Sequence, residues 1–270
     1  MARKKYGMDE ARIARFIREG RGAGEGARYK PWLTISDVPS RGRSHRFHCP
    51  KTGRTHHLLS DNEYMAFLKC WWDDDVIDIR EQFPILDRRE TVIIAAALGI
   101  RHPVYPSSQA LMVITSDLVV TKGRGAQRTT VVHAIKQAED LKNPRICDLL
   151  EIERRWWEQR GIEWSLMTEL HVKTQFTRNL SWILASGEDD GRGEEDDHVV
   201  FDVLAREAKR SNQTMPELCS DIDQRLALSG GRTLASFRRL MAAKRIRADL
   251  QRTDIIRLPA SAFSFHERPL

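Results

Sequence analysis

Two apolar, β-branched segments, each carrying one charged residue, constrain this chain most strongly. Residues 110–120 and 129–135 are rich in Val, Ile and Thr, and the polar segment 121–128 joins them. This pattern predicts two strands of a hairpin. Asp117 lies inside the first strand and Lys136 ends the second. Because an unpaired carboxylate in an apolar strand is costly, the pattern indicates either a buried pair of these two residues or a functional site on the hairpin.

The segments around this hairpin predict a compact α/β domain. Helical spacing of apolar residues is found over 9–19 and 60–72, and 144–161 begins with proline and ends with glycine. Residues 76–84 alternate and stop at a proline, and 162–167 form another short extended segment. A helix, three strands, a helix and a strand indicate an α/β core with a mixed sheet.

Two further acids come from the predicted helices. Glu63 lies three residues after Ser60, where a capping box explains it. Glu153 lies in a charged helix, whose exposed face explains it equally well. In this order, however, the acids and Lys136 match a metal-dependent phosphodiesterase of the restriction-endonuclease type, in which carboxylates hold a hard divalent cation and a lysine stabilises charge. The predicted catalytic residues are Glu63, Asp117 and Lys136, and the predicted metal ligands are Glu63, Asp117, Glu153 and the carbonyl of Ile135.

One ligand position departs from this motif. The usual nuclease motif has Glu, Asp or Gln two residues before the lysine, on the same face of the strand. Here that residue is Ala134. The sequence therefore leaves two hypotheses open, an active metal-dependent nuclease and a chain whose catalytic site is impaired.

The distribution of charge favours a nucleic-acid partner and a location in the cytoplasm. The net charge is +6, and residues 1–60 carry 14 Lys and Arg against 5 Asp and Glu. A basic region suits a polyanion, because neutralising phosphates releases counterions. No segment approaches the roughly 20 apolar residues that span a bilayer, so no membrane partner is expected. Four cysteines without a Cys-x-x-Cys pair indicate free thiols in a reducing compartment.

The pattern changes toward the C-terminus, which predicts a catalytic domain over 1–168 and a second domain over 169–270. An acidic segment, 188–197, is a predicted loop. Three predicted helices and a terminal hairpin then indicate an α-rich, winged-helix-like domain. The predicted helices are 199–210, 214–228 and 233–244, and the predicted strands are 246–250 and 253–258. Arg232, Arg238 and Arg239 would face DNA if the third helix is a recognition helix; the alternative is a surface that docks protein.

Several short motifs resemble those of the TnsA family, the endonuclease subunits of heteromeric bacterial transposases. They lie at 14–22, 31–34, 56–61 and 78–84, where the last reads Asp-Ile-Arg-Glu-Gln-Phe-Pro. The resemblance implies a restriction-endonuclease-like (PD-(D/E)xK) fold, Mg²⁺ with Mn²⁺ as a substitute, and a cytoplasmic bacterial protein. It also implies cleavage at the 5′ ends of a transposon, beside a TnsB-like transposase that acts on the 3′ ends and a TnsC-like AAA+ ATPase that contacts the C-terminal domain.

The resemblance also extends to single residues. Glu63 matches the family's helix glutamate, Asp117 its metal aspartate, Lys136 its catalytic lysine and Glu153 a further acid near the site. Ala134 stands where the family has glutamine. Two alternatives to the transposase nuclease therefore remain: an impaired adaptor that links transposase, DNA and ATPase, and a free-standing restriction-type nuclease that cuts alone.

Overall fold

The computed structural model describes residues 7–38, 43–124, 127–185, 193–251 and 253–267. The chain divides into two compact units, Met1–Lys173 and Thr174–Leu270, whereas the sequence analysis placed the boundary after residue 168. No helix within the described ranges is both long and apolar enough to cross a membrane.

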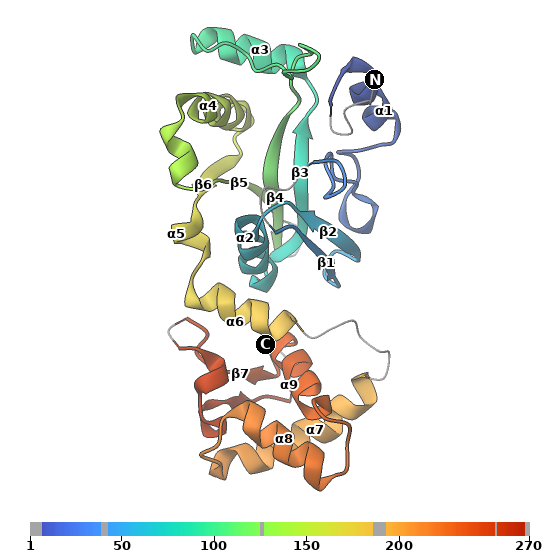
Figure 1. Ribbon diagram of the computed structural model, residues 1–270, viewed down its shortest axis with the longest axis vertical. Helices are drawn as coiled ribbons and strands as arrows, with labels where there is room; N and C mark the ends of the chain where they lie inside the picture. Colours follow the sequence, from blue (N-terminus) through green and yellow to red (C-terminus); the bar gives the residue numbers. More distant parts are fainter. Residues whose placement is uncertain (1–6, 39–42, 125–126, 186–192, 252, 268–270) are drawn as a thin grey trace. The chain divides into compact units, whose positions relative to one another are not determined.

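A four-stranded mixed sheet with the order β3-β4-β5-β6 forms the centre of the first unit (Figure 1). β3 and β5 both run antiparallel to β4, and β6 runs parallel to β5. The strands predicted from the sequence are confirmed, and so is the mixed sheet. The strands are β3 (Val76–Ile85), β4 (Ile114–Arg124), β5 (Gln127–Ile135) and β6 (Glu163–Met167).

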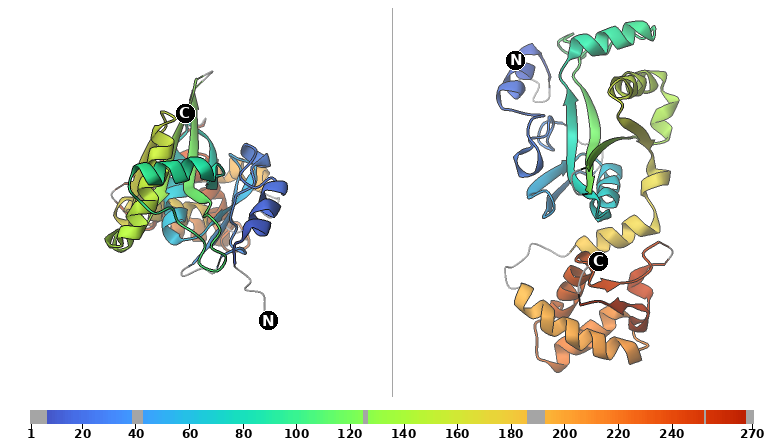
Figure 2. Two further views of the ribbon diagram at one scale, coloured as in Figure 1. Left: turned by 90° about the horizontal axis from the view of Figure 1, so that it is seen from above. Right: turned by 180° about the vertical axis from the view of Figure 1, so that it is seen from behind.

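Helices and a separate hairpin surround this sheet. Figures 1 and 2 show α1 and the β1–β2 hairpin beside β3, and α4 beside β6. The helices predicted over 9–19, 60–72 and 144–161 are confirmed, whereas α3 and the β1–β2 hairpin were not predicted. The helices are α1 (Glu10–Arg18), α2 (Asp61–Trp72), α3 (Arg88–Ala97), α4 (Pro144–Glu158) and α5 (Glu169–Val172), with 3₁₀ turns at Gly26–Arg28 and Glu139–Lys142; the hairpin is β1 (His45–Cys49) and β2 (Arg54–Leu58).

Charged side chains buried under the hairpin attach it to β3. Arg54 Nη1 donates to Glu81 Oε1 at 2.8 Å, and Arg54 Nη2 donates to the carbonyl oxygen of Ile79 at 2.7 Å. His56 Nδ1 lies 2.8 Å from Glu81 Oε2. Burial alone would raise the pKa of Glu81, but the hydrogen bonds from Arg54 and His56 lower it to about 2. Glu81 is therefore an ionised carboxylate at 0% exposure.

Apolar packing fixes α4 against the sheet. Ile152 of α4 packs in a buried cluster with Ile85 at the end of β3 and Ile114 at the start of β4. One turn further on, Trp157 packs with Val119 and other strand residues. This packing directs one face of α4 toward β4, and Glu153 lies on that helix beside Ile152.

Within its described residues, the second unit contains four helices and a two-stranded antiparallel sheet. The predicted strand 253–258 is wrong, because Ile255–Arg257 form a 3₁₀ turn and β7 pairs instead with β8. Part of the predicted acidic loop 188–197 lies outside the described residues, and α7 begins at Gly193, inside that range. The elements are α6 (Gln175–Leu184), α7 (Gly193–Glu207), α8 (Met215–Arg225), α9 (Arg232–Ala242), β7 (Ile246–Arg247) and β8 (Ser264–Phe265), with further 3₁₀ turns at Ala208–Arg210 and Ala260–Ala262.

Candidate active site

Asp117 lies where the sheet is irregular on both sides of β4. Toward β5 the regular ladder reaches the pair Leu118–His133, and Asp117 has no strand partner beyond it. Instead, the side chain of Asp117 bonds to β5, because its Oδ2 accepts the backbone N–H of Ile135 at 2.6 Å. On the β3 side, the strand pairing skips Gln82, which is the residue opposite Asp117. The carboxylate is thus fixed at a point where β4 and β5 separate.

Lys136 binds this carboxylate directly. Its Nζ donates to Asp117 Oδ2 at 2.8 Å and to the carbonyl oxygen of Ile135 at 2.9 Å. Burial alone would lower the pKa of Lys136, but the negative charges of Asp117, Glu153 and Glu63 raise it. The lysine is therefore charged, and its side chain is 28% exposed against 12% for Asp117. The pair of Asp117 and Lys136 expected from the sequence is present, and solvent reaches it from the lysine side.

Glu63 reaches the same region from the first turn of α2. Ser60 Oγ accepts the backbone N–H of Glu63, and the carboxylate accepts from Ser60 Oγ at 3.1 Å and from the backbone N–H of Leu59 at 2.9 Å. Glu63 therefore caps the helix, as its position after Ser60 predicts. Burial and the charge of Asp117 raise the pKa of Glu63 to about 7, so the same carboxylate also belongs to the electrostatic surroundings of Asp117.

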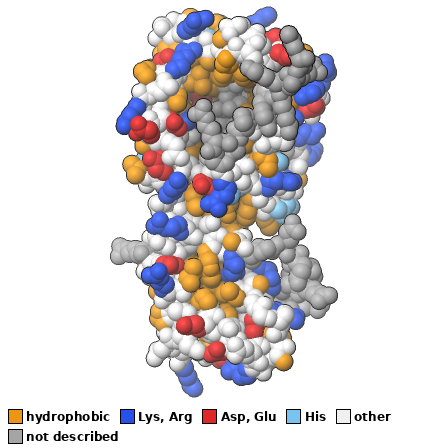
Figure 3. All heavy atoms as spheres, in the orientation of Figure 1, with side chains coloured by type: hydrophobic (Ala, Val, Ile, Leu, Met, Phe, Trp, Pro, Cys, Tyr) orange, Lys and Arg blue, Asp and Glu red, His pale blue; other side chains and the backbone are white. Residues whose placement is uncertain are grey.

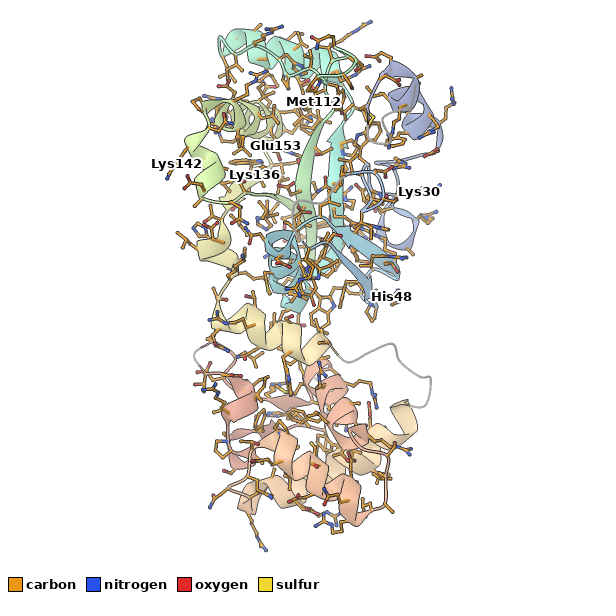
Figure 4. The ribbon with its side chains drawn as sticks, in the orientation of Figure 1. Lys30, His48, Met112, Lys136, Lys142 and Glu153 are labelled. Atoms are coloured by element: carbon orange, nitrogen blue, oxygen red, sulfur yellow. The ribbon has the colours of Figure 1, made fainter. Side chains whose placement is uncertain are left out.

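Glu153 approaches from α4. The exposed-face explanation for this residue is wrong, because Glu153 is 4% exposed. Trp164 of β6 donates its Nε1 to Glu153 Oε1 at 3.1 Å, and burial together with the charge of Asp117 raises the pKa of Glu153 to about 7. Figure 4 labels Glu153 on its helix and Lys136 after β5. All the side chains predicted for the site thus interact electrostatically with Asp117.

Comparisons with known proteins show the family of this chain. A family model described as TnsA-like endonuclease N terminal matches residues 73–169, and one described as TnsA endonuclease C terminal matches residues 171–250. The chain is also 36% identical over 249 residues to the transposon Tn7 transposition protein TnsA of Escherichia coli, which covers 90% of this chain and 87% of that relative. The chain belongs to the TnsA family.

Membership of the TnsA family confirms the resemblance read from the short motifs. It makes this chain a DNA endonuclease and a subunit of a heteromeric transposase. The mixed sheet of the first unit fits a restriction-endonuclease-like fold. Asp117, Lys136 and Glu153 lie inside the first matched range, and Glu63 precedes it.

The donors of this TnsA site suit a hard divalent cation. The donor atoms are carboxylate and carbonyl oxygens, the ligands that Mg²⁺ prefers, and burying several acids near Asp117 favours a positive charge among them. Among the described residues no group of three or more His, Cys, Asp or Glu side chains is already arranged to hold a metal ion. Mg²⁺ commonly keeps several waters and needs only one or two carboxylates plus substrate phosphates, so the donor set fits.

Two residues that bind the candidate acids were not singled out from the sequence. Gln82 donates its side-chain amide to Glu63, and Trp164 donates its indole N–H to Glu153. Neither is a close sequence neighbour of its acid, and the packing of α2 on β3 and of α4 on β6 brings these residues together. A Gln in an alternating strand and a Trp on a short strand carry no signal of their own for such contacts.

Charged side chains of both signs are mixed on one face of the described chain. On the face shown in Figure 3, Lys and Arg side chains are scattered over both units and interleaved with Asp and Glu. Among the described atoms of that face no single basic stripe stands out. The nucleic-acid-binding role of the basic N-terminal region stays a prediction.

Proposed function

We propose that this chain uses Mg²⁺, or Mn²⁺ in its place, to hydrolyse the phosphodiester bonds at the 5′ ends of a transposon. One arrangement carries the proposal: Lys136 binds Asp117 at the point where β4 and β5 separate, and two further buried acids, Glu63 of α2 and Glu153 of α4, are held on the same sheet by side chains of β3 and β6. Membership of the TnsA family supports the choice of DNA as the substrate.

Each residue has a separate task in this proposal. Asp117 and the carbonyl of Ile135 would hold the cation, with Glu153 and Glu63 as further ligands, directly or through water. When bound, the cation supplies Lewis-acid chemistry for the phosphate and lowers the pKa of water. The Lys136 ammonium, which is 28% exposed, would move toward the phosphate and stabilise the negative charge that develops there. Trp164 would keep Glu153 oriented.

We further propose that the second unit is a winged-helix-like module that docks protein rather than reading bases. Two of the arginines predicted to face DNA are already engaged within the unit. Arg239 Nη2 forms an ion pair with Asp197 at 2.7 Å, and Arg238 stacks on Trp182 and donates to its carbonyl oxygen. A TnsC-like AAA+ ATPase is the partner that the family resemblance suggests, with a TnsB-like transposase completing the cleavage complex.

Strand-specific mapping of cleavage tests the proposal. Transposon-end DNA is incubated with the chain and Mg²⁺, with and without the TnsB-like transposase, and nicks are mapped on each strand. We expect nicks at the 5′ ends only when both proteins and Mg²⁺ are present. Cleavage by the chain alone would favour a free-standing nuclease. Intact DNA despite measurable binding of the partner would favour the impaired adaptor.

Changing Ala134 to glutamine distinguishes the active chain from the impaired adaptor. Ala134 is 0% exposed, and overpacking a buried position costs about 1–3 kcal/mol. We therefore expect Ala134→Gln to lower the free energy of unfolding, measured by chemical denaturation, and to leave cleavage no faster than in the native chain. Ala96→Gln, on the exposed face of α3, is the matched control. A strong rise in cleavage with Ala134→Gln would show that the native site is impaired.

A further inference from the structure

Gln82 has a backbone conformation that a glutamine rarely adopts. Its φ is +49°, and it is 3% exposed in the middle of β3. For a residue with a Cβ atom this left-handed conformation is unfavourable, and such strain persists only where the surrounding structure fixes it. The presence of glutamine rather than glycine at this strained position therefore indicates that the side chain of Gln82 has a structural or functional role.

The strain lies at the residue opposite Asp117. Glu81 pairs with Leu118 and Phe83 pairs with Ser116, so the β3–β4 ladder passes over Gln82 and Asp117. The backbone carbonyl oxygen of Gln82 bonds outside the sheet, where it accepts the backbone N–H of Trp32 at 3.1 Å. Trp32 is itself fully buried against α1, which fixes the strained residue from outside the sheet.

The side chain of Gln82 connects this strand to α2. Its Nε2 donates to Glu63 Oε2 at 3.2 Å, in a buried contact. Ser60 and Leu59, which also bind the Glu63 carboxylate, belong to the cap of α2 itself. Gln82 thus ties Glu63 to the sheet at the level of Asp117. A neutral amide suits this task, because a carboxylate there would add negative charge and a cation would compete with Lys136.

We propose that Gln82 is a positioning residue of the cleavage site. Its left-handed backbone directs the side-chain amide onto Glu63 Oε2 and so sets where the Glu63 carboxylate lies relative to Asp117. This inference rests on the proposed nuclease function of these acids. Residues that orient a ligand in this way typically affect activity by about 10–100-fold when they are replaced.

The chain supplies a matched control for testing Gln82. Gln109 also has a left-handed backbone, with φ +58°, but it is exposed, and its Nε2 donates to the carbonyl oxygen of Pro106. Gln82→Met and Gln109→Met remove the same amide from the same backbone conformation, and only the first lies beside Glu63. Gln82→Gly is a second variant that removes the side chain and relieves the strain, so it decides the question if Gln82→Met does not fold.

Two readouts on the full chain test the proposal. The first is the rate of end cleavage at saturating DNA, partner transposase and Mg²⁺, beside the affinity for DNA and the free energy of unfolding. The second is the ¹³C resonance of the Glu63 carboxyl group, assigned with Glu63→Gln. For Gln82→Met and Gln82→Gly we expect cleavage to fall by about 10–100-fold, DNA affinity to stay within twofold, and the Glu63 resonance to move. Gln109→Met should change none of these.

Three outcomes overturn the proposal. Cleavage by Gln82→Met within twofold of Gln109→Met would remove the role in activity. An unmoved Glu63 resonance would show that any loss of cleavage does not act through Glu63. Asp117→Ala, assayed in parallel, separates this failure from that of the proposed function. If Asp117→Ala cleaves as fast as the native chain, the site itself is wrongly assigned; if it is inactive while Gln82→Met is unaffected, only the role of Gln82 fails.

Discussion

Replacing Asp117 with alanine is expected to lower the rate of end cleavage by at least about 10³-fold, because metal-borne stabilisation of the transition state supplies several kcal/mol. Asp117 Oδ2 holds the Lys136 ammonium and the backbone N–H of Ile135 at the point where β4 and β5 separate. Without that carboxylate the proposed cation loses its central ligand, and Lys136 loses the partner that orients it. The measurement is single-turnover cleavage with the partner transposase and saturating Mg²⁺.

Asp78→Ala is the matched control for this prediction. Asp78 lies on the neighbouring strand β3 and is 7% exposed, against 8% for Asp117. It also accepts a backbone N–H, that of Gly26, at 3.1 Å, but it is not among the acids around Lys136. Asp78→Ala should lower stability by about 1–3 kcal/mol and leave cleavage near the native rate below its unfolding temperature. Equal cleavage losses in the two variants would attribute the Asp117 effect to folding rather than chemistry.

The centre of the site was predictable because charge there conflicts with its local pattern. Asp117 and Lys136 interrupt or end apolar strands, and burying a charge requires a partner. Glu63 is recognisable in a different way, since Ser60 marks the start of its helix. The structure brings all three into one region. Their proximity could be predicted because each residue carries a local signal and the pairing of β4 with β5 follows from two adjacent strands.

The burial of Glu153 and the backbone conformation of Gln82 could not be predicted from the sequence, for physical reasons. The charged sequence around Glu153 resembles an exposed helix face, and its burial follows only from the packing of Ile152 and Trp157 on the sheet. The left-handed backbone of Gln82 has no sequence signature in a residue other than glycine, because tertiary contacts such as the bond from Trp32 impose it.

The wrong strand in the second unit has a similar cause. Residues 253–258 have the apolar composition of a strand, but Asn179 donates to the carbonyl oxygens of Leu250 and Thr253. Asp254 then accepts the backbone N–H of Ile256 and starts a 3₁₀ turn. A residue more than seventy positions away in the sequence thus helps to override the local β-propensity.

Arg54→Met is expected to lower the free energy of unfolding by about 3–5 kcal/mol at neutral pH, since it leaves one partner of a buried ion pair uncompensated. Arg54 is the arginine of the β1–β2 hairpin that, with His56, binds the Glu81 carboxylate, and Glu81 is 0% exposed. Arg154→Met is the matched control. Arg154 bonds Glu151 at the same 2.8 Å, but that pair lies at the surface of α4 with side chains 32% and 34% exposed, and surface pairs contribute about 0–1 kcal/mol. Urea denaturation of the three chains measures the difference.

The dependence on pH gives this prediction a second check. The pKa of Glu81 is about 2 in the folded chain, against an ordinary value of 4.5. A depressed carboxyl pKa contributes stability above the unfolded pKa, and this contribution is lost as pH falls from 4.5 toward 2. In Arg54→Met the pKa of Glu81 rises, so the native chain should lose its advantage over the variant within that window. A destabilisation that stays constant from pH 7 to pH 3 would contradict the role of Glu81. Arg54→Met combined with Glu81→Met should be less unstable than Arg54→Met alone, because no buried carboxylate then lacks its arginine.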